Sequence, residues 1–272
     1  MEALHGAFRT SRESARSRPT QHRDMRRVAI VQARSTSSRL PGKVFADLAG
    51  APLLKRLLER VGRAKQLDDI VVATTTNRED DGIVAIADSV GARWSRGSEH
   101  DVLGRVAKAA SEARADVVVR ICGDCPLLDA SIVDRAVCAL VHAEAAVDFV
   151  STEPPMTFPR GLDVEALFGD VLARVERMAT SRPAREHVTY FIYGEAPSLF
   201  RRLTIGDAED NSDQRWTVDT ADDLAFVRKL YGNLDLVHTH VPYQDVIAYV
   251  RARPGLRAIN AHVVQKDPSK EA

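Results

Sequence analysis

Cations gather on one short stretch that follows the first apolar run of the chain. This stretch reads QARSTSSRLPGK and carries Arg34, Arg39 and Lys43, with a turn-forming Pro-Gly pair just before the lysine. Guanidinium groups bind paired oxygens, and an ammonium group supplies a point charge. The stretch therefore predicts a cradle for a polyphosphate. The alternative is an ordinary solvated basic loop.

The same stretch excludes two common phosphate-binding motifs. A Walker A element needs glycine where this chain has Ser37, and serine or threonine where it has Val44. No GxGxxG pattern follows the first apolar run either. Both differences argue against a P-loop ATPase and against a dinucleotide-dependent oxidoreductase.

Two aspartates follow apolar runs of β type and are candidates for holding a metal ion. Asp124 follows the run Val117–Ile121, and Asp219 follows Trp216–Val218. Mg²⁺ usually takes one or two protein carboxylates together with phosphate oxygens and water. Acid placement at a helix start is a strong rival explanation for Asp222 and Asp223, but it explains Asp219 less well.

The chain also contains a CxxC pair and two histidines close together. Cys122 and Cys125 are open to three interpretations: a redox pair, half a zinc site, or incidental neighbours. No second CxxC or nearby CxxH completes a zinc site, and the pair lies deep in a long chain, so we interpret it as incidental. For His238 and His240 we likewise expect no metal.

Alternating apolar runs and helical patterns predict the elements that position these residues. The alternation is typical of βαβ units, and hence of an α/β fold with a mostly parallel twisted sheet and helices on both faces. Ligands bind outside the carboxyl ends of the strands in such a sheet. The expected strands are Val28–Val31, Ile70–Ala73, Val117–Ile121 and Asp148–Val150, and the expected helices are Leu53–Val61, Glu79–Val90, Asp101–Arg114 and Ile132–Ala146.

The alternation of strands and helices stops at a proline-rich loop. We therefore expect an insertion at about residues 151–210 that covers the mouth of the sheet. The expected elements within it are a strand at Leu162–Phe168, helices at Val171–Met178 and Ala184–Tyr193, and a strand at Leu199–Ile205. Trp216–Val218 is predicted as a return to the sheet, followed by a helix at Thr220–Leu230 capped by Thr220 and a last helix at Tyr243–Val250. The main domain is expected over residues 25–258, before a polar tail at 259–272.

Composition narrows the function classes. The chain has 272 residues with 38 basic and 38 acidic side chains, so its net charge is zero, which argues against a nucleic-acid binder held by its overall field. No apolar window approaches the length of a membrane span. Three cysteines and no secretory signal favour the cytoplasm. Residues 1–24 are predicted to be a disordered extension; an organelle transit peptide is the alternative.

Beyond these arguments, the sequence resembles the SpsF-type cytidylyltransferases, relatives of the CMP-KDO and CMP-sialic acid synthetases. The resemblance runs from about Val28 to Tyr231 and is specific, because its motifs occur in order. They are QARSTSSRLPGK, VVATTTN, RGSEHDVLGR, VRICGDCPL, PRGLDVEA, REHVT and RWTVDTADDL. It implies a nucleotide-diphospho-sugar transferase type of fold, often dimeric, and transfer of CMP from CTP with Mg²⁺.

By the same resemblance, residue roles carry over position by position. Arg34, Arg39 and Lys43 match triphosphate-binding positions and, with Asp124, the catalytic set; Asp124 and Asp219 match the two metal-binding aspartates. The wider nucleotide site takes in Gln32, Ala33, Ala73, Thr74, Gly97 and Ser98. The acceptor-binding candidates are Arg160, Asp163, Arg185, Glu186 and His187. Cys122 stands where KDO synthetases carry glutamine, so base contacts made by that residue do not transfer.

The function expected is transfer of CMP from CTP to a small anionic acceptor, with release of pyrophosphate and with Mg²⁺ as cofactor. The acceptor is a sugar acid, such as a nonulosonic acid, or a phosphorylated or phosphonate metabolite. We expect a homodimer that binds neither nucleic acid nor membrane. The alternatives are a glycosyltransferase that uses a nucleotide-sugar donor and a non-catalytic nucleotide-binding regulator.

Overall fold

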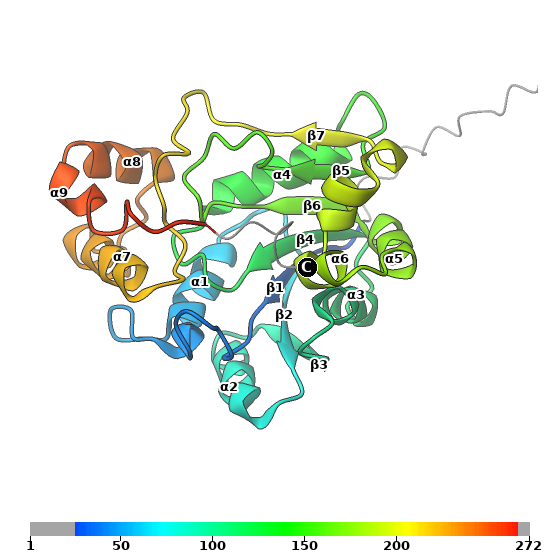
Figure 1. The fold of residues 1–272 in the computed structure, drawn as a ribbon, viewed down its shortest axis with the longest axis horizontal. Helices are drawn as coiled ribbons and strands as arrows, with labels where there is room; N and C mark the ends of the chain where they lie inside the picture. The colour runs from blue at the N-terminus through cyan, green and yellow to red at the C-terminus, as the bar shows by residue number, and fades with distance from the viewer. Residues whose placement is uncertain (1–24, 266–272) are drawn as a thin grey trace, which may run out of the picture.

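The computed structural model describes residues 25–265, which form one seven-stranded sheet flanked by helices (Figure 1). The predicted extension at residues 1–24 lies outside the described residues, as does the end of the predicted polar tail. The strand order is β3-β2-β1-β4-β6-β5-β7. The strands are β1 (Arg27–Gln32), β2 (Asp69–Thr75), β3 (Arg93–Gly97), β4 (Val117–Cys122), β5 (Phe149–Ser151), β6 (Glu165–Phe168) and β7 (Arg202–Thr204).

Parallel pairing dominates the sheet, which confirms the predicted fold class. Strand β1 pairs in parallel with β2 and β4, β2 with β3, and β5 with β7, whereas β6 runs antiparallel to both of its neighbours. Register places Gln32 at the end of β1 beside Ala73 of β2 and Cys122 of β4. The carboxyl ends of the three central strands therefore meet at one edge of the sheet.

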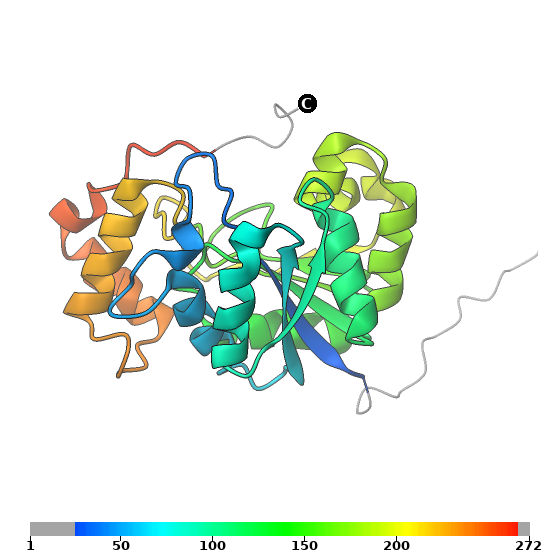
Figure 2. The same ribbon diagram turned by 90° about the horizontal axis from the view of Figure 1, so that it is seen from below.

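Helices cover the sheet in two groups. Helix α1 (Leu53–Val61) contacts α2 (Asp81–Ser89) and α4 (Ala130–Val141), whereas α3 (Val102–Glu112) contacts α5 (Gly169–Met178) and α6 (Arg182–His187). Figure 2 shows the central strands between these groups. At one end of the sheet lie α7 (Ala221–Asn233), α8 (Tyr243–Arg251) and α9 (Pro254–Arg257) (Figure 1).

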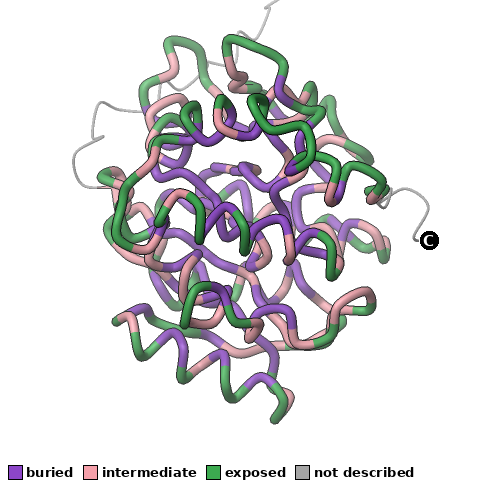
Figure 3. Tube along the Cα trace, turned by 90° about the vertical axis from the view of Figure 1, so that its left-hand side faces the viewer, coloured by how far each residue is buried: buried purple, intermediate pink, exposed green. Residues whose placement is uncertain are grey.

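The core follows from the apolar runs that predicted the strands. Val28–Val31 are fully buried in the middle of β1, as expected of a strand covered on both faces. Figure 3 shows buried positions concentrated in the interior and exposed ones on the outer turns of the helices. Among residues 25–265, no helix combines the length and the apolar composition that a bilayer crossing requires.

The structure corrects three element predictions. Strand β3 was not predicted, because its sequence RWSRG shows no apolar run. Trp216–Val218 is not a strand; only its neighbour Arg215 forms an isolated bridge, with Arg160. The single helix predicted at Ala184–Tyr193 is interrupted at Val188, whose φ of 55° is incompatible with a continuing α-helix.

The segment predicted as an insertion, about residues 151–210, contributes directly to the sheet. It supplies β6 and β7 as well as α5 and α6. Beyond it, α7 begins as the sequence predicts. The Thr220 hydroxyl accepts from the backbone N–H of Asp223, and the Asp223 carboxylate accepts from the Thr220 N–H, which completes a capping box.

Candidate active site

The cation-rich loop after β1 is folded back on itself at the carboxyl edge of the sheet. The backbone N–H of Gly42 donates to the carbonyl of Ser35 over 2.8 Å, and Gly42 adopts a φ of 72° that side chains rarely accept. The carboxylate of Asp80, beyond β2, accepts from the Ser35 N–H over 2.8 Å. These contacts aim Lys43, which follows Gly42 directly, into the interior.

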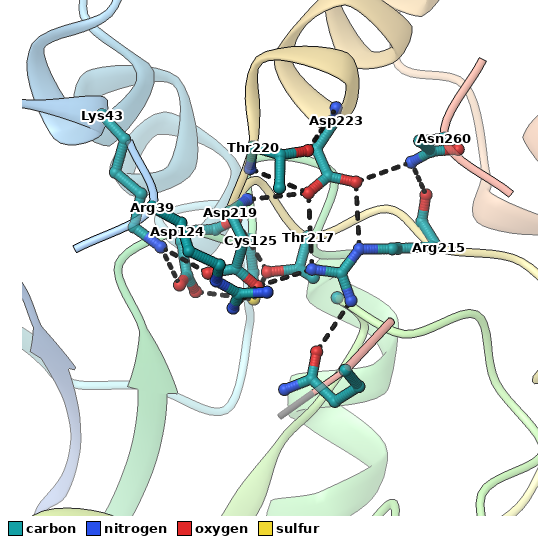
Figure 4. A network of polar contacts seen from close by, with 12 residues as sticks. Arg39, Lys43, Asp124, Cys125, Arg215, Thr217, Asp219, Thr220, Asp223 and Asn260 are labelled. Carbon is teal, nitrogen blue, oxygen red and sulfur yellow. Dashed lines mark hydrogen bonds and ion pairs between the residues drawn. The ribbon is translucent and has the colours of Figure 1, made fainter. Parts of the chain in front are cut away.

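Lys43 joins the two aspartates that the sequence singled out (Figure 4). Its Nζ lies 2.6 Å from Oδ2 of Asp124 and 2.8 Å from Oδ1 of Asp219. Arg39, from the same loop, places its Nη2 at 2.8 Å from Oδ2 of Asp219. Four predicted site residues, from three distant parts of the sequence, thus form one cluster.

Backbone contacts bring the two aspartate segments together. The N–H of Val218 donates to the carbonyl of Asp124 over 2.8 Å, and the Thr217 hydroxyl donates to the same carbonyl over 3.3 Å. The segment before α7 therefore lies across the end of β4 without becoming a strand. This crossing places Asp219 beside Asp124.

Arg215 and Asp223 support Asp219 from behind, and sequence reasoning missed this role. Arg215 reaches Asp219 Oδ2 over 2.6 Å and Asp223 Oδ1 over 2.9 Å, and Asp223 is fully buried. The Asp223 carboxylate also accepts from the N–H of Asp219 and from Asn260 Nδ2 (Figure 4). Asp223 is thus a structural acid, and Asn260 belongs to the tail that was predicted as merely polar.

Neighbouring charges determine the protonation states of Lys43 and Asp219 in this cluster. Burial alone would lower the pKa of Lys43, but the charges of Asp124 and Asp219 and the hydrogen bonds to both hold it well above its usual value. Burial alone would raise the pKa of Asp219, but Lys43, Arg39 and Arg215 hold it below its usual range. Lys43 is therefore cationic and Asp219 anionic at neutral pH.

The donor set at the cluster fits a magnesium ion bound together with phosphate. Two carboxylates face one ammonium group, so their spacing suits a single small cation. Mg²⁺ needs few protein carboxylates when phosphate oxygens and water complete its six ligands. Among residues 25–265, no group of three or more acidic, histidine or cysteine side chains is arranged to bind a metal by itself.

Arg34 points to a different side of the site from Arg39 and Lys43. Its guanidinium donates to the carbonyl of Glu99 over 3.4 Å and pairs with Glu186 of α6 over 3.3 Å. Glu99 lies in the loop between β3 and α3, and Arg105 of α3 donates to the carbonyl of Ser98 in the same loop. Burial and the charge of Arg34 lower the pKa of Arg105 to about 10.

The other predicted nucleotide-binding residues line the ends of the first three strands. The Ala33 N–H donates to the Ala73 carbonyl over 3.1 Å, and the Thr76 N–H donates to the Gly97 carbonyl over 3.0 Å. Gln32 accepts from Arg120 through its side chain. Thr74 is fully buried, and no hydrogen-bond partner of its hydroxyl lies among the described residues.

The predicted acceptor residues fall into two groups. Arg160 pairs with Glu153 over 3.7 Å, and Asp163 accepts from the Gly161 N–H over 3.0 Å. Burial and the charge of Asp163, opposed by Arg160, raise the pKa of Glu153 to about 7, and burial also raises the pKa of Asp163, with the charge of Asp124 contributing.

The second group lies on α6, next to Arg34. Arg185 pairs with Asp101 and with Glu176, so its guanidinium ties α6 to the start of α3 and to α5. Glu186 meets Arg34. The carbonyl of His187 accepts from the N–H of Thr189 over 2.6 Å, just beyond the backbone turn at Val188.

The CxxC cysteines are free thiols in unreactive surroundings. Burial raises the pKa of Cys122 to about 12, against the charge of Arg120, and raises that of Cys125 well above its usual value. A thiol must ionise to act as a nucleophile or metal ligand. This environment supports the interpretation of the pair as incidental neighbours.

Comparison with known proteins gives consistent results along most of the chain. Residues 28–244 match the family described as cytidylyltransferase. An uncharacterized protein of Methanocaldococcus jannaschii, MJ1063, is 36% identical over 244 residues, covering 89% of this chain and 97% of that protein. The spore coat polysaccharide biosynthesis protein SpsF of Bacillus subtilis is 32% identical over 209 residues, covering 74% and 85%.

A solved structure shares the arrangement of the elements. The structure of a cytidylyltransferase from Leptospira borgpetersenii superposes with a TM-score of 0.80 at 27% identity. The match covers 89% of this chain and 100% of that one.

Proposed function

The chain belongs to the cytidylyltransferase family, and from this premise we propose that it transfers CMP from CTP to a small anionic acceptor with the help of Mg²⁺. Cytidylyl transfer itself follows from the family. The acceptor class, the metal and the residue roles are our proposal.

One observation carries the proposal: Lys43, Arg39, Asp124 and Asp219 converge at the carboxyl edge of the sheet. Cations from the loop suit the triphosphate of CTP, and two facing carboxylates suit the metal ion that accompanies it. Ligands of open parallel sheets bind at this edge. Support also comes from Arg34, which lies at the other end of the loop, beside the ends of β2 and β3.

The reaction forms a bond between an acceptor oxygen and the α-phosphorus and breaks the bond from that phosphorus to the bridging oxygen of pyrophosphate. Arg39 and Lys43 would hold the phosphates and stabilise the charge that builds on the leaving group. Asp124 and Asp219 would hold Mg²⁺, which supplies further charge stabilisation when bound. Positioning and electrostatics provide most of the catalysis in such transfers.

We place the acceptor side of the site around Arg160 and Asp163. The charges of both act on Glu153, and the charge of Asp124 acts on Asp163, so these groups lie close to one another and to the proposed metal ligands. An acceptor that attacks through a carboxylate, phosphate or phosphonate oxygen needs no general base. A sugar hydroxyl must lose its proton during attack. Of the predicted acceptor residues, Arg160 is the best placed to bind an anion, since its ion pair with Glu153 is long, at 3.7 Å.

The two alternatives lack a supporting observation. A glycosyltransferase would leave the cation-rich loop unexplained, and the family match names cytidylyl transfer. A non-catalytic regulator would not need the paired carboxylates, which are both present.

The test is release of pyrophosphate from each of the four NTPs, with and without Mg²⁺, against a panel of sugar acids, sugar phosphates, phosphonates and neutral sugars. We expect release with CTP, Mg²⁺ and an anionic acceptor, and formation of the CMP-linked product by mass spectrometry. Release with neutral sugars alone, or equal release without metal, would contradict the acceptor class or the metal.

A further inference from the structure

Lys43 already occupies the position between the two carboxylates that we assign to the metal ion. We propose that Lys43 and the divalent cation exchange on the same pair of carboxylate oxygens, so that the cation binds only as the nucleotide's phosphates draw Lys43 away. This inference rests on the proposed function, because it takes Asp124 and Asp219 as the metal ligands.

The contacts of Asp219 leave one of its carboxylate oxygens where Lys43 and a metal ion could replace each other. Its Oδ2 is held by Arg39 at 2.8 Å and by Arg215 at 2.6 Å, whereas its Oδ1 faces Lys43 at 2.8 Å. The same Lys43 nitrogen lies 2.6 Å from Oδ2 of Asp124. On Asp219 a cation must therefore use the oxygen that Lys43 now contacts, and Oδ2 of Asp124 is the oxygen that faces the same position.

The two cations compete for these oxygens. Mg²⁺ binds carboxylate oxygens at about 2.0–2.1 Å and requires a near-octahedral shell. An ammonium group on the same two oxygens would repel it at short range, in a site that is largely screened from water. Lys43 is only 9% exposed, so solvent does little to weaken that repulsion.

Compared with Arg215, Lys43 is the cation at Asp219 that is able to move. Arg215 is fixed by Asp223 at 2.9 Å and by Gln265 at 2.7 Å in addition to Asp219. Lysine, by contrast, carries a point charge on a flexible four-carbon chain. A triphosphate offers it a denser negative charge than two carboxylates. The nucleotide thus frees the carboxylates for the metal, and by reciprocity the metal favours the nucleotide.

The experiment measures Mn²⁺ binding to the full chain without nucleotide, by loss of the free-ion EPR signal. We expect weak binding by the wild type, and on the order of tenfold or tighter binding by Lys43→Met, since a competing charge is removed. Lys43→Arg, which keeps the charge, and Lys229→Met, which removes an exposed lysine of α7, should resemble the wild type. Mn²⁺ should also raise the melting temperature of Lys43→Met more than that of the wild type.

The wild type alone gives a second test, which needs no variant to fold. By calorimetry, CTP should bind in the presence of EDTA, whereas Mn²⁺ should bind poorly without CTP. Tight Mn²⁺ binding by the nucleotide-free wild type, or equal affinities for wild type and Lys43→Met, would overturn the exchange. Either result is distinguishable from failure of the proposed function, which would appear as no pyrophosphate release from CTP by the wild type.

Discussion

Asp124 and Asp219 both contact the ammonium group of Lys43, so we expect their contributions to turnover to depend on each other. Either change to asparagine keeps the shape but removes a charge that we assign to the metal. Turnover should fall on the order of 10²–10³-fold for each, and the double variant should be little worse than the poorer single one. Mg²⁺-dependent pyrophosphate release from CTP measures this. Near-normal turnover and an unchanged Mg²⁺ half-saturation for Asp219→Asn would rule out the two-carboxylate site.

Arg215 touches no proposed substrate, yet it fixes the orientation of Asp219. Arg215→Lys keeps the charge but loses the forked contact to Asp219 and Asp223. We expect metal affinity to fall by about 10–100-fold, as for other residues that orient a metal ligand. The measurement is Mn²⁺ affinity in the presence of CTP, with Arg228→Lys on the exposed face of α7 as control. An unchanged affinity would limit Arg215 to a structural role.

Glu153 gives the protein a pH dependence of its own. Its folded-state pKa of about 7 lies above the unfolded value of about 4.3, so the folded protein binds the extra proton more tightly. Stability should therefore rise as pH falls from about 7 toward 4.5, through this group. Glu153→Gln should flatten that rise and melt higher than the wild type at pH 8. If the melting temperatures of the two proteins change with pH in the same way across this range, Glu153 ionises normally.

At the scale of elements, the crossing of the Arg160 and Arg215 segments depends on one glycine. Gly161 has a φ of 105°, and a Cβ there would lie 2.5 Å from the backbone nitrogen of Thr217. Gly161→Ala should destabilise the fold by several kcal/mol, since both strain and overlap act on rigid backbone. Gly232→Ala is the matched control, because a Cβ meets nothing within 4 Å in α7 and alanine favours the helix by roughly 1 kcal/mol. Chemical denaturation compares the two, and equal stabilities would contradict the argument.

The elements also show how far the sequence alone could go. Central strands such as β1 and β4 were predictable because both of their faces are covered, which demands continuous apolar runs. Edge strand β3 was not predictable in this way, since Trp94 is 45% exposed and Arg93 and Arg96 form ion pairs with Asp69 and Asp81. The crossing at Trp216–Val218 has the apolar composition of a strand, because Trp216 and Val218 are fully buried, but its backbone partners come from the end of β4 and from Arg160.

The same limit applies to the site. The sequence could single out Arg34, Arg39, Lys43, Asp124 and Asp219 as candidates because cations and acids directly after strands are unusual. Arg215 and Asn260 were missed, since an arginine in a loop and an asparagine in a polar tail look solvated. Only the fold shows that both meet a buried carboxylate.

At the scale of the whole molecule, the described fold begins at Met25, and the contacts of the candidate site described above join residues within 25–265. The sequence of residues 1–24 is poor in apolar side chains, and ordering costs roughly 1–2 kcal/mol per residue, so we predict that the rest of the chain does not depend on this segment. A chain that starts at Met25 should keep full turnover and the same melting temperature. Pyrophosphate release and thermal melting measure both, and a clear loss of either would show that the extension packs on the body.

The position of Asn260 sets an order of events during synthesis of the chain. Lys43 and Asp124 emerge from the ribosome early, Arg215 and Asp219 follow much later, and Asn260 comes last. Because Asn260 lies 37 residues after Asp223, their contact can form only after residue 260 has been added, and so later than the contacts of Arg215 and Asp219. Nascent chains that end before residue 260 therefore lack the support that Asn260 gives to Asp223 and, through it, to Asp219, and they should bind CTP more weakly than longer chains.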